Sequence, residues 1–135
     1  MKPNNIIALK CTADSFYRMW IEFLTPFHKL TAREKDVAAR IIAQYFKLRE
    51  HSDDPVVLRE LLWSKTSKKD MIASLGMSQA YFQMVISRLK ENNVIVNGDL
   101  NPKYIPHKST EEPRFILQVV YDWSTPKNPI KNEAK

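Results

Sequence analysis

Only two of the 135 residues are glycine, and their surroundings constrain the fold more than any other feature. Gly76 lies between "KKDMIASL" and "MSQAYFQMVISRLK", two stretches whose apolar residues recur at helical spacing. Glycine adopts the left-handed conformation that a tight turn between two helices requires. Ser78 follows, and serine is a favoured N-cap residue. Residues from about 67 to 90 are therefore predicted to form a helix-turn-helix.

The second glycine predicts a β-hairpin. In "VIVNGDLNPKYI" a β-branched run leads into Asn97-Gly98, a dipeptide that favours the positive φ angles of a two-residue hairpin turn, and a second short extended run follows. A hairpin directly after a helix-turn-helix is a wing. Residues from about 94 to 106 are therefore predicted to form the wing.

Three further helices are predicted upstream. Thr31 and Glu34 form a capping box at the start of an amphipathic helix, and Pro55 suits the first turn of a short helix that includes Val56 to Leu62. An earlier helix runs through "DSFYRMWIEFL" and ends before Pro26. Its apolar face from Phe16 to Leu24 is either core or a dimer interface.

Both ends of the chain carry strand-like patterns. "NIIALKC" predicts a strand from about residue 5 to residue 11, and "RFILQVVYDW" predicts a C-terminal strand for which the first is a candidate partner. Residues 125–135 are polar and basic, which predicts a disordered tail. The expected architecture is a single α+β winged helix-turn-helix domain over residues 1–124, with an added N-terminal strand and helix and a C-terminal strand.

The stretch "MIASLGMSQAYFQMVISRLKENNVI" resembles the winged-helix family, particularly MarR-type regulators, and "LTAREKDVAARI" is similar to the preceding helix of that family. "NGDLNPKYI" also has a faint similarity to winged-helix plasmid replication initiators. The resemblance implies that the helix from Ser78 to Lys90 enters the major groove of double-stranded DNA. It also implies a homodimer, for which the Phe16 to Leu24 helix is the candidate contact. The chain departs from the family at Ile72, where a small residue is preferred, and in the inserted helix that includes Val56 to Leu62.

The distribution of charge agrees with an anionic partner. The formal net charge is +6, and residues 64–90 carry five cations against Asp70 alone. Phosphate contacts require such positive charge, and glutamine and serine side chains read base edges in the major groove. The candidate DNA-binding residues are Lys65, Lys68, Lys69, Ser78, Gln79, Tyr81, Gln83, Ser87, Arg88, Lys90 and Lys103. His107 and Lys108 are further candidates for phosphate contact. The alternative is a solvated polar face, with Tyr81 packed beside Phe82.

Enzymatic and metal chemistry find little support in the sequence. His28, His51 and His107 lack metal-ligand spacing, and there is no glycine-rich phosphate loop. Cys11 is the only cysteine, so no disulfide within the chain is expected. No run of about 18 apolar residues would span a membrane. We expect a cytoplasmic, non-enzymatic protein that uses no cofactor or metal and has no membrane association.

Two functions fit these patterns. The first is DNA binding in transcription regulation or replication initiation. The alternative is a structural or assembly protein, such as a component of a phage particle or of a multiprotein complex, that docks protein or binds DNA non-specifically. An enriched sequence motif after selection from random DNA favours the first function, and salt-sensitive binding without a motif favours the second.

Overall fold

A computed structural model describes residues 7–108, 114–120 and 122–124, and it is mostly helical with one small sheet. The helices are α1 (Ala13–Phe23), α2 (Thr25–His28), α3 (Ala32–Arg49), α4 (Pro55–Leu62), α5 (Lys65–Leu75) and α6 (Gln79–Glu91). Strands β1 (Ile95–Val96) and β2 (Asp99–Leu100) and the 3-10 helix η1 (Pro102–Tyr104) follow. This composition agrees with the predicted α+β class.

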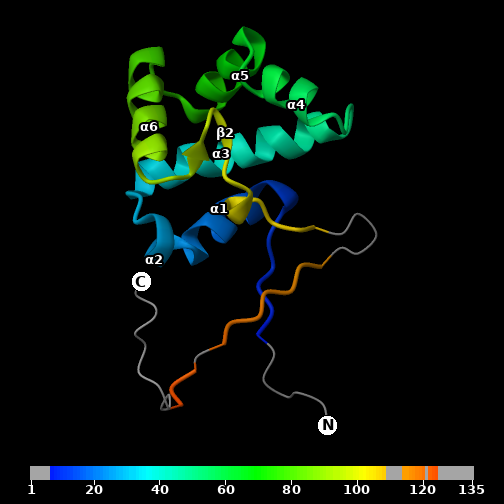
Figure 1. Cartoon of the computed structure of the whole chain (residues 1–135), viewed down its shortest axis with the longest axis vertical. Coiled ribbons are helices and arrows are strands. Elements are labelled where there is room, and N and C mark those ends of the chain that lie inside the picture. Colours follow the sequence, from blue (N-terminus) through cyan, green and yellow to red (C-terminus); the bar gives the residue numbers. More distant parts are fainter. Residues whose placement is uncertain (1–6, 109–113, 121, 125–135) are drawn as a thin grey trace.

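Helix α3 is the centre of the fold. Its N-cap is Thr31, whose hydroxyl accepts a hydrogen bond from the Glu34 amide while the Glu34 carboxylate accepts one from the Thr31 amide, so the predicted capping box is confirmed. Its apolar stripe includes Ile41 and Ile42, which are fully buried. Helices α1, α4, α5 and α6 all pack against α3 (Figure 1). The core therefore surrounds one helix.

A tight turn joins α5 to α6. Gly76 ends α5 with φ 65° and ψ 38°, and its amide donates to the Ile72 carbonyl at 3.0 Å. Open space surrounds the position where a Cβ would lie, so the left-handed backbone alone favours glycine there. Ser78 then caps α6 by accepting a hydrogen bond from the Tyr81 amide at 3.1 Å. The predicted sequence of helix, tight turn and helix is confirmed.

The hairpin is the antiparallel pair β1 and β2, joined by Asn97 and Gly98. Ile95 pairs with Leu100, Val96 pairs with Asp99, and the turn residues have φ angles of 54° and 76°. Two positive φ angles define the turn that Asn-Gly predicts. The hairpin lies within the expected range of residues 94–106.

The two terminal strands predicted from the sequence are wrong for the described residues. Residues 7–12 and 114–120 are not in strands, and the side chains of Ile7 and Ile116 are 88% and 85% exposed. Strand preference depends on packing against neighbouring strands, and the only sheet in the described part of the chain is the hairpin. The start of the first predicted strand and the predicted disordered tail lie outside the described residues.

The apolar face of α1 is used largely within the chain. Phe16 and Trp20 contact Phe115 edge to face, with ring centroids 5.0 and 5.5 Å apart, and the Trp20 indole donates to the Tyr104 carbonyl at 2.8 Å. Ile21 is fully buried. This favours core over dimer interface for most of the face. Pro26 does follow the end of α1, but it lies in the first turn of α2, a helix that the sequence did not predict.

Helix α4 is present where an inserted helix was predicted, with Pro55 at its first position and the Asp54 carboxylate as its N-cap. None of the helices in the described ranges is long and apolar enough to cross a membrane.

Candidate nucleic-acid interface

Helix α6 has one buried and one exposed side. Phe82, Val85 and Leu89 are at most 1% exposed, because they face α3 and the core. The exposed side carries four of the predicted site residues at helical spacing: Gln79, Gln83, Ser87 and Lys90. We call these four side chains the α6 outer face. They could meet one partner together, because side chains three or four residues apart in a helix point the same way.

Two other candidates on α6 serve the local structure. The Ser78 hydroxyl caps α6 by accepting a hydrogen bond from the Tyr81 amide, so one of its two acceptor positions is used within the chain. Tyr81 is partly buried against the core cluster. This placement matches the packing alternative considered for Tyr81.

The candidate lysines lie on either side of α6 in the sequence. Lys65 and Lys69 on α5 are exposed and Lys68 is half-buried, while Lys103 is exposed on η1, immediately after the hairpin. In the described ranges, none of these lysines, nor Lys90, has a carboxylate within ion-pair distance. Within the part of the chain that the structure describes, their charges are therefore not neutralised by an ion pair.

Arg88 has a structural role. Its guanidinium bonds the Glu34 carboxylate at 3.1 Å and the Glu91 carboxylate at 3.2 Å, which joins α6 to the start of α3. The hydrogen bond to Glu34 raises the pKa of Arg88. Burial works to raise the pKa of Glu34, but hydrogen bonds from the Thr31 amide and from Arg88 keep it below its ordinary value. Among the candidate cations, Arg88 alone is engaged by carboxylates of the residues that the structure describes.

A second arginine, which is not among the predicted site residues, binds the end of α5. Arg33 of α3 donates to the carbonyl of Leu75, the last residue of α5, at 2.7 Å, and it also pairs with Asp36 at 3.3 Å. Carbonyls at the end of a helix lack partners within the helix, and a cation complements their partial negative charge. No local sequence signal predicts this contact, because the partners are 42 residues apart.

An exposed apolar side chain lies beside the polar ones. Met84 is 53% exposed on the side of α6 away from the core, and Val96 of the hairpin is 38% exposed. Methionine is adaptable and common at protein-docking surfaces, and apolar side chains also contact thymine methyl groups in DNA. Met84 therefore fits either class of partner.

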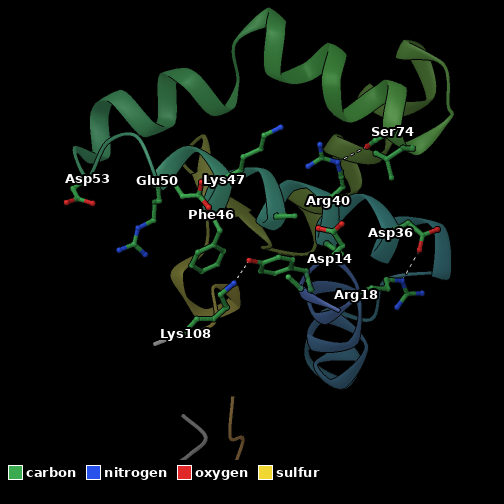
Figure 2. A pocket seen from close by; sticks show the side chains of 16 residues that line it. Asp14, Arg18, Asp36, Arg40, Phe46, Lys47, Glu50, Asp53, Ser74 and Lys108 are labelled. Carbon is green, nitrogen blue, oxygen red and sulfur yellow. Dashed lines mark hydrogen bonds and ion pairs between the residues drawn. The ribbon is translucent and has the colours of Figure 1, made fainter. Parts of the chain in front are cut away.

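An open groove of about 1110 Å³ lies between α1, α3 and the end of α5 (Figure 2). Arg40 points across it and donates to the Ser74 hydroxyl at 2.7 Å, and burial lowers the pKa of Arg40. The lining mixes cations such as Lys47 with carboxylates such as Asp14 and Asp53. With both signs interspersed, the groove has no uniform field that would select an anion or a cation.

The two candidates after the hairpin behave differently from each other. His107 is exposed. Lys108 is exposed as well, but its ammonium lies against aromatic rings of α1 and α3 at one end of the groove (Figure 2). The Lys108 ammonium is therefore already engaged by these rings, which does not favour the predicted phosphate contact.

The described part of the chain contains no group of three or more histidine, cysteine, aspartate or glutamate side chains that could hold a metal ion. His28 is 1% exposed and bridges two backbone groups: its Nε2 bonds the Ile21 carbonyl at 2.8 Å, and its Nδ1 accepts from the Leu30 amide at 3.0 Å. This histidine is a structural residue. Comparisons with family models, curated proteins and solved structures gave no match to the chain.

Proposed function

We propose that the chain is a DNA-binding winged-helix protein that acts in transcription regulation or replication initiation. In this proposal α6 enters the major groove of double-stranded DNA, the hairpin is the wing, and the lysines of α5 contact phosphates. The resemblance to MarR-type regulators and to plasmid replication initiators supports the same function.

The observation that carries the proposal is the α6 outer face. It presents Gln79 and Gln83 one helical turn apart, with Ser87 and Lys90 following at helical spacing. Glutamine makes bidentate contacts with adenine, and serine bonds either base edge. The nearest acid on α6, Glu91, is paired with Arg88, which limits its repulsion of phosphates.

The lysines add the electrostatic part. Lys65, Lys68 and Lys69 lie on the helix before the recognition helix, where backbone contacts occur in helix-turn-helix complexes. Lys103 lies after the wing, where it would meet a neighbouring phosphate. Each phosphate contact releases counterions and steepens the dependence of affinity on salt.

The deciding experiment is selection of bound duplexes from a random DNA pool, followed by salt titration on an enriched and a scrambled site. The proposal expects an enriched motif, tighter binding to it at one fixed salt concentration, and a salt slope that falls by about 0.9 for each phosphate-contacting lysine removed. The lack of detectable binding to any duplex at low salt would refute it.

The second candidate function is assembly of a phage particle or of a multiprotein complex, and exposed Met84 and Val96 favour it. The variant Met84→Lys separates the two. If α6 faces DNA, an added cation there tightens binding to every sequence and raises the salt slope by about 0.9. If DNA binds elsewhere on the chain, the slope does not change, and the outer side of α6 is left for a protein partner.

A further inference from the structure

Three aromatic rings lie close to the ammonium of Lys108, which is an exposed residue. Its Nζ lies 4.5 Å from the ring centroid of Tyr17, 4.7 Å from that of Phe46 and 5.7 Å from that of Phe16. It also donates a hydrogen bond to the Tyr17 hydroxyl. Ring faces attract a cation through their quadrupole, and such cages are a known mode of ammonium recognition. We call Phe16, Tyr17 and Phe46 the aromatic cage.

The cage joins segments that are distant in the sequence. Phe16 and Tyr17 come from α1, and Phe46 comes from α3; Tyr17 and Phe46 stack with centroids 5.6 Å apart. Lys108 follows the hairpin and η1. Two helices of the core thus hold the chain that leaves the hairpin.

This stretch of chain has a second anchor before Lys108. Tyr104 is 4% exposed, and its carbonyl accepts the hydrogen bond of the Trp20 indole at 2.8 Å. The Asn101 amide donates to the Val94 carbonyl at 2.8 Å, which ties the exit of the hairpin to its entry. Strand β1 in turn packs against α6. The position of the hairpin therefore depends on α6 at one side and on these anchors at the other.

We propose that Lys108 is a positioning residue for the hairpin. Its ammonium, held in the aromatic cage, attaches the segment after the hairpin to α1 and α3. We call this attachment the fastening. Neutralising this ammonium, by substitution or by acetylation, removes the attraction and loosens the hairpin exit. The effect of Lys108 on DNA binding rests on the proposed function, whereas the fastening itself does not. Lys108 would then strengthen binding without touching a phosphate.

Amide hydrogen exchange tests the fastening. The variants are Lys108→Met, which keeps an unbranched side chain but removes the charge, and Lys108→Arg, which keeps a cation. Lys103→Met is the matched control, because Lys103 is an exposed lysine of the same stretch. The amides to follow are those of Asn101 and Tyr104, which donate to the carbonyls of Val94 and Asn101.

We expect Lys108→Met to speed exchange of these amides on the order of tenfold, as the loss of a cation–π contact implies. Lys108→Arg should restore most of the protection, and Lys103→Met should not change it. The amides of Ile41 and Ile42 in α3 should exchange as in the natural chain, which separates loosening of the hairpin from general destabilisation. The proposal would be overturned if the Asn101 and Tyr104 amides exchanged at the same rate in Lys108→Met as in the natural chain. It would also be overturned if Lys108→Met accelerated exchange in α3 as much as at these two amides.

Salt titration on a random-sequence duplex tests the consequence. Lys108→Met should lower affinity with an unchanged salt slope, whereas Lys103→Met should lower the slope by about 0.9. A slope lowered by about 0.9 in Lys108→Met would mean that Lys108 contacts a phosphate, which overturns its positioning role. Unchanged affinity despite faster exchange would overturn the consequence for binding. If the natural chain binds no duplex, the proposed function fails, and the exchange rates still decide the fastening.

Discussion

At the scale of single residues, the two glutamines of α6 test whether the proposed DNA binding includes recognition of bases or only attraction to phosphates. Both are exposed and one helical turn apart, and neither supports the core. Their removal should therefore affect recognition of bases without affecting folding.

We predict that Gln79→Ala and Gln83→Ala each lower discrimination between an enriched site and scrambled DNA by about 1–3 kcal/mol, because a bidentate contact to a base is lost. Non-specific affinity should stay nearly unchanged, since phosphate contacts supply it. The measurement is the ratio of the two affinities at one salt concentration. A ratio that stays constant in both variants would show that these side chains do not read bases, and the assembly function would then be favoured.

His28 makes a prediction about pH. Burial lowers its pKa from the ordinary 6.5, so the folded protein keeps it neutral while the unfolded chain takes up a proton near pH 6.5. A group whose pKa is lower in the folded state than in the unfolded state stabilises the fold fully above the unfolded pKa. Its contribution is lost as the pH falls below 6.5.

We therefore expect the free energy of unfolding to decrease below pH 6.5, by at most about 1.4 kcal/mol per pH unit from His28 alone. In His28→Gln the protein should be less stable at neutral pH, but its stability should depend less on pH between 6.5 and 5. Denaturant melts across this range, compared between the two proteins, measure the difference. Parallel curves would contradict the role assigned to His28.

At the scale of elements, two arginine contacts join α5 and α6 to α3. Arg33 bonds the carbonyl of Leu75 at the end of α5, and Arg88 bonds Glu34 at the start of α3. Both contacts cross between helices. The Arg33 contact lies at the turn and the Arg88 contact lies near the end of α6, so the two contacts supplement the apolar packing of both helices against α3.

These contacts predict that Arg88 and the lysines of α5 behave differently, although the sequence predicts both to be DNA-binding residues. Arg88→Met should lower the melting temperature and leave the salt slope of DNA binding unchanged, because Arg88 serves Glu34 and Glu91. The double variant Lys68→Met with Lys69→Met should keep the melting temperature nearly constant and lower the slope by up to about 1.8. Thermal melts and salt titrations on the same samples make the comparison. A lowered salt slope in Arg88→Met would show that Arg88 contacts a phosphate.

The same scale shows which elements could be predicted. The α5–α6 turn, the hairpin and the start of α3 depend on local chemistry, namely Gly76, Asn97-Gly98 and the capping box, so the sequence predicted them correctly. The terminal strands could not be decided locally, because a strand needs a partner strand. The ion pair of Arg88 and the cage around Lys108 join residues 54 or more positions apart, which no spacing rule reveals.

At the scale of the whole molecule, α1 distinguishes folding from association. Trp20 bonds Tyr104 and packs on Phe115, whereas Phe23 on the same helix is 54% exposed. The homodimer suggested by the family resemblance would therefore have only the end of α1 available. The two aromatic residues should respond differently to the same change.

We predict that Trp20→Glu lowers the melting temperature, because it places a charge among apolar groups and removes the indole hydrogen bond. Phe23→Glu should keep a cooperative melt at nearly the same temperature. Light scattering then reports whether Phe23→Glu changes the mass of the particle in solution. A folded protein of unchanged stability in Trp20→Glu would show that Trp20 is not part of the core.

The central place of α3 also has a kinetic consequence. Four other helices pack on α3, so forming it and its first partner brings together the surface on which the remaining helices condense. Its capping box lets much of its structure arise from local contacts, and chains rich in local contacts fold quickly. Truncation of Ile41 should therefore slow folding, with a φ-value well above that of Val85 in α6, whose truncation should mainly speed unfolding. The helix that orients the candidate recognition surface would then also be the folding nucleus, and α6 would be among the last elements to dock.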